Sequence, residues 1–225
     1  MKENIVYIVN PKSGKLSKTK KIRIIENIDP STKPEIVFSQ SLEDAGKKAQ
    51  EFMLKKYLVV ACGGDGFINI IAQKAIDFSC NMAILPFGSG NDFARSLDLD
   101  TLEKAIDAIR VGKFKSVRYL KIIFSDNSRI SLTNAGVGLL SEASYRASRI
   151  PVLKGSLLYA SAALISFLNL KSHRYAITTD FKKFEMTNLI LAGAASEYTG
   201  GGMYIAPDAK KFRDKLNLLF AKKLS

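Results

Sequence analysis

A turn of three glycines and one aspartate, Gly63-Gly64-Asp65-Gly66, directly follows the apolar run Tyr57–Cys62 and is the strongest constraint in the sequence. Glycine has no Cβ, so the backbone of such a turn can adopt positive φ angles and bring its N–H groups close to an anion. The next residues, Phe67–Asp77, carry apolar side chains at helical spacing, which predicts a helix beginning beside the glycines. This combination is typical of a nucleotide phosphate site. The simpler interpretation is a tight reversal between a strand and its helix.

Two further segments favour the phosphate site, because each also places polar and glycine residues after a predicted strand. Ile5–Val9 runs into Asn10-Pro11-Lys12-Ser13-Gly14, and Met82–Pro86 runs into the segment Phe87–Arg95. Within that last segment, the Gly-Ser-Gly sequence at 88–90 and the amide that follows it can form a turn and a helix N-cap. Ligands of open α/β sheets bind at the carboxyl ends of the strands, so the three loops predict one crevice.

Strand and helix patterns alternate over the first half of the chain. The predicted strands are Ile5–Asn10, Glu35–Ser39, Leu58–Ala61 and Met82–Leu85, and the predicted helices are Leu16–Ile28, Leu42–Lys56, Phe67–Asp77 and Leu102–Val111. Such alternation indicates βαβ units in a mainly parallel sheet. After about Lys113 the pattern becomes strand-like, at Ser116–Ser125, Arg129–Asn134, Tyr175–Thr179, Phe184–Ala195 and Leu216–Ala221. We predict an α/β nucleotide-binding domain at 1–115, with an open, mainly parallel sheet flanked by helices, and a second, β-rich domain at 116–225.

The loops resemble motifs of the diacylglycerol kinase catalytic domain family, especially its soluble bacterial lipid kinases, which are related to NAD kinases. Residues 10–14 resemble the family's Asn-Pro-x-(Ser/Ala)-Gly, residues 63–66 its Gly-Gly-Asp-Gly, and residues 85–95 its Leu-Pro-x-Gly-(Thr/Ser)-x-Asn-Asp-Phe-Ala-Arg. Residues 134–138 and 200–209 resemble signatures of the family's second domain. The resemblance covers most of the chain. It implies an NAD kinase-like fold with a hinge near residue 115 and a ligand cleft between the domains.

The resemblance also implies two cofactors, ATP and Mg²⁺, and a set of site residues. The residues expected around the nucleotide are Asn10, Pro11, Lys12, Ser13, Gly14, Ser39, Gly63, Gly64, Asp65, Gly66, Asn69, Ser89, Asn91 and Asp92. The catalytic role falls to Asp65, which would orient the phosphates directly or through magnesium. Its alternative role is to cap the helix after Gly66, and the two roles are compatible.

Three departures from the family pattern concern activity more than fold. Phe67 stands where a threonine usually follows the glycine turn, and Ile70 stands where a glutamate follows the asparagine. The family's metal-binding Asp-Gly-x-Leu appears as Asp214-Lys215-Leu216, so Asp214 is the candidate magnesium ligand. The family's late Asp-Gly-Glu segment, which supplies its proposed catalytic base, has no counterpart before Ser225. We therefore expect a second domain that is incomplete relative to the family and lacks this base.

The formal net charge of +13 favours an anionic partner. The lysines are scattered and no recognition motif for nucleic acid is present, so nucleic acid is disfavoured. Basic residues flank the apolar segment Ser156–Leu170 and recur between 210 and 223, so we expect a lipid substrate at an anionic membrane surface. A merely solvated basic surface is the alternative. The segment itself is too short to span a bilayer and is expected to be a core helix in preference to an interfacial one.

The two cysteines, Cys62 and Cys80, lie in apolar surroundings without disulfide or metal-ligand spacing. This pattern suits reduced thiols in a cytoplasmic protein, here one peripherally associated with a membrane. An incomplete β-domain would leave unpaired strand edges, which a second copy of the chain would cover in a homodimer.

The expected function is an ATP-dependent lipid kinase that phosphorylates the hydroxyl of diacylglycerol or a related lipid. One alternative is a catalytically inactive relative that retains binding of nucleotide and of a membrane surface. Another is an NAD kinase, which shares the glycine turn but agrees less well with residues 10–14 and 88–92.

Overall fold

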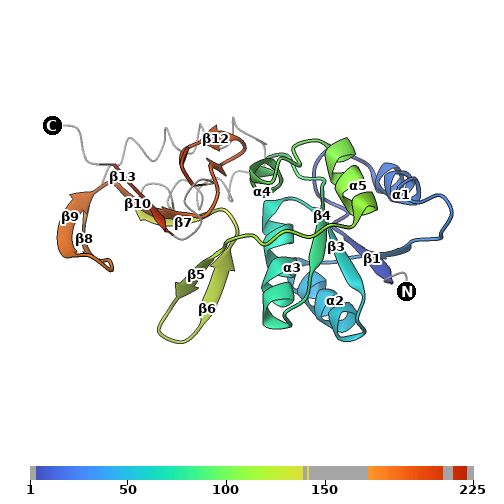
Figure 1. Ribbon diagram of the computed structural model, residues 1–225, viewed down its shortest axis with the longest axis horizontal. Coiled ribbons are helices and arrows are strands. Elements are labelled where there is room, and N and C mark those ends of the chain that lie inside the picture. The colour runs from blue at the N-terminus through green and yellow to red at the C-terminus, as the bar shows by residue number, and fades with distance from the viewer. Residues whose placement is uncertain (1–3, 139–140, 142–171, 210–214, 222–225) are drawn as a thin grey trace. The chain divides into compact units, whose positions relative to one another are not determined.

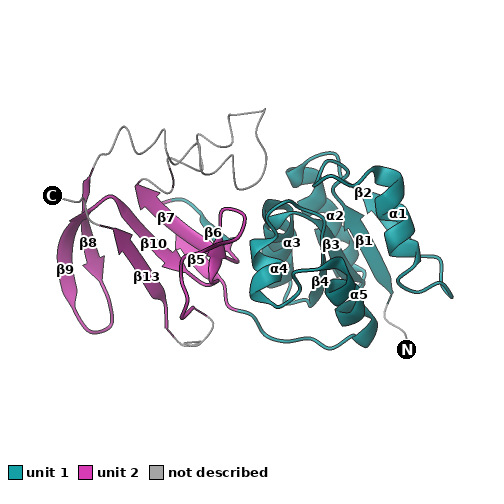
Figure 2. Cartoon of the chain, turned by 90° about the horizontal axis from the view of Figure 1, so that it is seen from above, with its two compact units in different colours: residues 1–117, 126–130 teal, residues 118–125, 131–225 magenta. Residues whose placement is uncertain are grey.

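The computed structural model describes residues 4–138, 141, 172–209 and 215–221. The chain divides into two compact units (Figure 2), residues 1–117 with 126–130 and residues 118–125 with 131–225. The first unit is an α/β domain with a parallel sheet, and the second is rich in β-strands. The predicted fold class is therefore confirmed.

The sheet of the first unit contains four parallel strands in the order β2-β1-β3-β4. The strands are β1 (Ile5–Val9), β2 (Glu35–Phe38), β3 (Leu58–Gly63) and β4 (Met82–Pro86). The chain passes from β1 to β2 on one side and then crosses to β3 on the other, so the direction of winding reverses between β1 and β3. Ligands of doubly wound sheets bind at this switch point, outside the carboxyl ends of the strands.

Five helices belong to the first unit. They are α1 (Lys18–Glu26), α2 (Leu42–Leu54), α3 (Asp65–Asp77), α4 (Asp92–Ser96) and α5 (Leu102–Val111). Side-chain oxygens of Ser17, Ser41 and Thr101 accept hydrogen bonds from the first turns of α1, α2 and α5, which is why these helices begin where they do. Helix α3 begins two residues earlier than predicted, at Asp65, so the glycine turn is partly helical.

The sheet is buried on both faces. Residues from α1 and α5 form one hydrophobic cluster with alternate strand residues: Tyr7, Val9, Ile25, Ile28, Val60, Cys62, Leu85, Phe87 and Ala105. Helices α2 and α3 pack against each other and against β3 on the opposite face (Figure 1). All six residues of β3 are buried, which explains its continuous apolar sequence.

The second unit contains a three-stranded antiparallel sheet in the order β13-β10-β7. Its strands are β7 (Asn134–Gly138), β10 (Ile190–Ala194) and β13 (Asn217–Ala221). Strands β8 (His173–Thr178) and β9 (Lys183–Asn188) form a hairpin, and β11 (Tyr198–Thr199) pairs with β12 (Met203–Tyr204). Strand β5 (Leu120–Ile123) pairs with β6 (Ser128–Ser131), of which residues 128–130 belong to the first unit.

Two predicted strands are each divided into two in the structure. The run Phe184–Ala195 is divided between β9 and β10, which belong to different sheets, and the amide of Leu189 at the break donates to Ala221 O. The run Arg129–Asn134 is divided between β6 and β7. The predicted core helix Ser156–Leu170 lies outside the described residues. Among the helices that are described, none combines the length and apolarity needed to cross a bilayer.

Candidate functional site

The loops after β1, β3 and β4 meet at the carboxyl edge of the parallel sheet. A Cβ on Gly14 would lie 2.0 Å from the carbonyl oxygen of Phe87, and a Cβ on Gly88 would lie 2.5 Å from Cα of Gly64. Strand β3 separates β1 from β4 in the sheet, so the β1 loop must pass the end of β3 to reach Phe87. Only glycine permits such backbone approaches, and the φ of +62° at Gly14 also favours glycine. The structure thus brings the three predicted loops together.

The β1 loop, residues 10–14, is folded by the side chain that opens it. Asn10 Oδ1 accepts a hydrogen bond from Lys12 N at 2.9 Å, which closes an Asx turn. Ser13 Oγ donates to Asn10 O at 3.0 Å, and Asn10 N donates to Cys62 O at 2.9 Å, so the loop remains attached to the end of β3. Asn10 therefore fixes the loop's shape through both its side chain and its backbone.

Beneath this loop lies Lys21, a residue that the sequence interpretation missed. Its side chain is 0% exposed, and its Nζ donates to Asn10 O at 2.9 Å, Pro11 O at 3.1 Å and Ser13 O at 2.7 Å. Burial lowers the pKa of the Lys21 ammonium. A sequence signal exists, because Lys21 precedes the buried Ile25 and Ile28 by four and seven residues and so falls on the apolar stripe of α1.

Asp65 joins the β3 turn to the loop after β4. Its Oδ1 accepts a hydrogen bond from Phe93 N, in the first turn of α4, at 3.0 Å. The capping alternative needs correction: Asp65 is the first residue of α3, and the N-cap is Gly64, which has no side chain. The carboxylate stands at the N-terminal end of the α3 dipole, where negative charge is favourable, but its hydrogen bond is with α4.

Asn91 occupies the N-cap position of α4 without capping it through its side chain. Its backbone is left-handed, with φ at 54°, and Nδ2 donates to Pro86 O at 3.2 Å and to Gly88 O at 3.1 Å. The side chain therefore closes the β4 loop on itself. Asp92 beside it is buried, at 6% exposure, whereas Ser89 at the tip of the loop is exposed.

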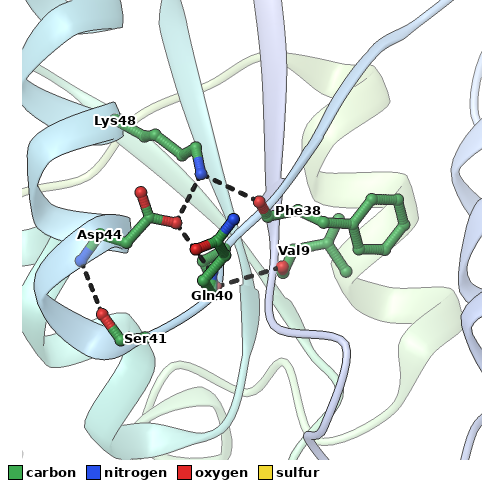
Figure 3. Close-up of polar contacts among 7 residues, drawn as sticks. Val9, Phe38, Gln40, Ser41, Asp44 and Lys48 are labelled. Carbon is green, nitrogen blue, oxygen red and sulfur yellow. Dashed lines mark hydrogen bonds and ion pairs between the residues drawn. The ribbon is translucent and has the colours of Figure 1, made fainter.

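The β2 loop brings Ser39 to the same edge of the sheet. Ser39 is buried, and its N–H donates to Val9 O, at the end of β1, at 3.0 Å. Asp44 Oδ2 accepts the N–H of Gln40 at 2.8 Å, and Lys48 Nζ donates both to Asp44 Oδ2 and to Phe38 O (Figure 3). The hydrogen bond from Lys48 and, after it, the one from Gln40 N–H lower the pKa of Asp44. This network holds the backbone on either side of Ser39.

The departures Phe67 and Ile70 are accommodated by packing. Phe67 is 3% exposed, and a Cβ on Gly63 would lie 2.5 Å from its ring. Ile70 packs against Gly46 of α2. Neither residue supplies the polar group that its family counterpart would.

Asn69 lies one turn into α3, where its side chain is engaged by backbone. Its Nδ2 donates to Ile130 O at 3.0 Å, and Gln73 Oε1, one turn further along α3, accepts from Ile130 N at 3.1 Å. Gly66, in the first turn of α3, and Lys12, in the β1 loop, were also predicted at the site and are exposed. The predicted metal ligand Asp214 lies outside the described residues. The described part of the chain contains no cluster of three or more His, Cys, Asp or Glu side chains suited to a metal ion.

The protein-family model of the diacylglycerol kinase catalytic domain matches residues 4–122, which is more than half of the chain. The chain belongs to this family. The YegS C-terminal NAD kinase beta sandwich-like domain matches residues 133–225. The predicted family resemblance is therefore confirmed in both parts of the chain.

Similar proteins come from several bacteria. The chain is 27% identical over 186 residues to a diacylglycerol kinase of Bacillus subtilis (strain 168), covering 80% of this chain and 60% of that one. It is 28% identical over 219 residues to a diacylglycerol kinase of Staphylococcus saprophyticus, covering 93% of this chain and 70% of that one. A solved structure of a diacylglycerol kinase from Bacillus anthracis str. Sterne has a TM-score of 0.74 at 24% identity, covering 98% of this chain and 76% of that one. The last likeness concerns the fold alone.

Gly88→Ala is expected to lower the free energy of unfolding by about 1–3 kcal/mol, because the new methyl group would overlap the backbone of Gly64. Urea denaturation measures the loss. Gly66→Ala is the matched control, since nothing lies within 4 Å of its added Cβ, and there alanine should be neutral or stabilise by up to about 1 kcal/mol. Equal stability of the two variants would contradict the close approach of the loops.

Asp65→Ala is expected to cost about 1–2 kcal/mol of unfolding free energy, because Phe93 N–H loses its acceptor. Asp65→Asn should cost less, since Oδ1 still accepts. Asp77→Ala, at the exposed end of the same helix, serves as the control and should change stability by less than about 0.5 kcal/mol. Equal free energies of unfolding for Asp65→Ala and Asp77→Ala in urea would refute the stabilising connection between Asp65 and α4.

The hydrogen bond from Gln40 N–H to the Asp44 carboxylate is expected to persist to a lower pH than it would with an aspartate of ordinary pKa. The folded-state pKa of Asp44 is depressed, so its contribution to stability is present above the unfolded-state pKa and is lost as pH falls through the folded-state pKa. The amide resonance of Gln40 in ¹H–¹⁵N spectra should follow this titration. Lys48→Met should raise the midpoint toward that of an ordinary aspartate; an unchanged midpoint would rule out Lys48 as the main cause.

Proposed function

We propose that this chain is the nucleotide-binding and catalytic part of an ATP-dependent lipid kinase. The observation that carries the proposal is the meeting of three glycine-containing loops at the switch point of a doubly wound sheet. The close approaches of Gly14 to Phe87 and of Gly64 to Gly88 bring the backbones of the loops together. Membership of the diacylglycerol kinase family supports ATP as the phosphoryl donor.

The phosphates of ATP would lie against the β1, β3 and β4 loops. The N-cap residue Gly64 has no side chain, so it cannot accept hydrogen bonds from the N–H groups in the first turn of α3. Asp65 would orient the phosphates with the part of its carboxylate not bonded to Phe93. The proposed set remains residues 10–14, 39, 63–66, 69, 89, 91 and 92, with Ser39 at the margin nearest β2.

Magnesium would arrive with the nucleotide. Mg²⁺ commonly takes one or two carboxylates together with phosphate oxygens and waters in place of a complete protein cage. This arrangement agrees with the described residues, which contain no cluster of three or more acidic, His or Cys side chains. Bound Mg²⁺ would neutralise charge on the transferring phosphoryl group.

The acceptor would be the hydroxyl of diacylglycerol or a related lipid, presented at an anionic membrane surface to a cytoplasmic, peripherally bound protein. The net charge of +13 supports attraction to such a surface, and relatives from two bacteria are named diacylglycerol kinases. A homodimer stays a prediction.

A catalytically inactive, nucleotide-binding relative is the second candidate. One observation favours it: Phe67 fills the space beside Gly63 with an aromatic ring where the family usually has a threonine. The chain spans 60% of the length of the Bacillus subtilis relative. Transfer and binding must therefore be measured separately.

The deciding experiment supplies Mg²⁺ and γ-³²P-labelled ATP to the purified chain with mixed micelles containing diacylglycerol, a sphingoid base or no lipid. Labelled lipid is expected with diacylglycerol, and Asp65→Asn should reduce its rate by about tenfold or more. Asp77→Asn, at the other end of α3, removes an equal charge and should leave the rate within about twofold. NAD, tested in parallel as acceptor, should remain unlabelled.

Binding of ATP without any labelled product would identify the inactive relative. Labelled NAD would instead identify an NAD kinase. Equal rates for Asp65→Asn and Asp77→Asn would remove Asp65 from the mechanism while leaving the kinase assignment intact.

A further inference from the structure

The ammonium of Lys21 is buried beneath the β1 loop without a charged hydrogen-bond acceptor. Its four acceptors are three carbonyl oxygens, of Asn10, Pro11 and Ser13, and the Ser13 hydroxyl at 3.2 Å. A buried charge is expensive unless it is well hydrogen-bonded or paired. The four acceptors satisfy the donors of the ammonium but leave its charge without a carboxylate partner among them, which suggests a role beyond packing.

The Lys21 contacts determine which way the peptide groups of the loop face. A trans peptide group directs its N–H away from its C=O. The Ser13 carbonyl points toward Lys21, so the N–H of Gly14, in the same peptide group, points away from Lys21. The Pro11 carbonyl also points toward Lys21, so the N–H of Lys12 points away from it and donates to Asn10 Oδ1. Carbonyl oxygens, which repel anions, are thereby gathered on the core side of the loop.

We propose that Lys21 is the positioning residue of the β1 loop: it holds the loop's carbonyls inward so that the N–H of Gly14 faces a bound polyphosphate, and its own charge attracts that anion through the loop. The proposal rests on the nucleotide site proposed above and deepens it. Lys21 does not contact the phosphates, because the loop backbone lies between them. The Phe87 ring, with Lys21 Nζ 5.7 Å from its centroid, supports the ammonium from the β4 side.

Burial lowers the pKa of the Lys21 ammonium, and its hydrogen-bond acceptors are all uncharged. Cys62 is the ionisable neighbour that affects its pKa, and burial keeps the thiol of Cys62 protonated by raising its pKa well above the usual value. Neither Cys62 nor the hydrogen-bond acceptors therefore carry a negative charge that would cancel the ammonium. This contrasts with Lys48 at the β2 loop, whose charge is matched by Asp44.

The test compares Lys21→Met with Lys20→Met by calorimetric titration of ATP, inorganic tripolyphosphate and adenosine in magnesium buffer. Both variants lose one positive charge from α1, but Lys20 is exposed. Lys21→Met is expected to weaken ATP and tripolyphosphate by about tenfold or more while adenosine changes by less than about twofold. Lys20→Met should leave all three within about twofold. An equal loss for adenosine would reveal a merely structural role and overturn the proposal.

A second measurement uses the unaltered chain, so the proposal stays testable if Lys21→Met does not fold. Tripolyphosphate should shift the Gly14 amide resonance in ¹H–¹⁵N spectra. Gly112, a helix C-cap with a similar positive φ of 65°, is the matched control and should not move. A stationary Gly14 resonance under saturating tripolyphosphate would overturn the assignment.

The outcomes for Lys21 and for the kinase are distinguishable. If lipid is phosphorylated and Lys21→Met binds tripolyphosphate like the unaltered chain, the inference about Lys21 fails alone. If tripolyphosphate binding depends on Lys21 but no lipid is labelled, the kinase proposal fails alone.

Discussion

The site depends on the contact of backbone with backbone at the end of β3. Gly64 and Gly88 approach so closely that a single methyl group on Gly88 would separate their loops, and Gly14 rests on the Phe87 carbonyl in the same way. The other polar contacts of the edge presuppose this geometry. Asp65 reaches Phe93 N–H, 28 residues further along the chain, only because the β3 and β4 loops touch. Glycine here determines tertiary structure as well as local turn shape.

Much of the first unit could be predicted from the sequence because its signals are local. Continuous apolar runs, glycine turns and apolar periodicity fixed four parallel strands and the loops that follow them. The start of α3 was placed two residues late, since glycine has low helix propensity and hides the first turn. In the second unit, the break at Leu189 carries no glycine or proline, because the change of sheet is decided by pairing with Ala221, a contact distant in sequence.

The burial of Lys21 could not be predicted from its residue type, because lysine side chains are normally exposed to solvent. Its environment consists of carbonyls that converge only when the β1 loop has folded over α1. Its position on the apolar stripe with Ile25 and Ile28 was the available signal, and that signal indicates burial without naming a partner. The same limit applies to Asn69. The family resemblance predicts that it lies near the nucleotide, but its side-chain amide donates a hydrogen bond to the backbone carbonyl of Ile130.

Two lysines support two neighbouring loops by the same device, a hydrogen bond from Nζ to backbone carbonyls, with opposite electrostatic consequences. Lys48 holds Phe38 O but is paired with Asp44, so the β2 loop gains rigidity without net charge. Lys21 holds the β1 loop through uncharged acceptors, so positive potential is concentrated there. An anion at this edge of the sheet is therefore drawn to the β1 side, at the switch point, in preference to the Ser39 side. In the nucleotide complex proposed above, that asymmetry would favour the phosphates over the β1, β3 and β4 loops.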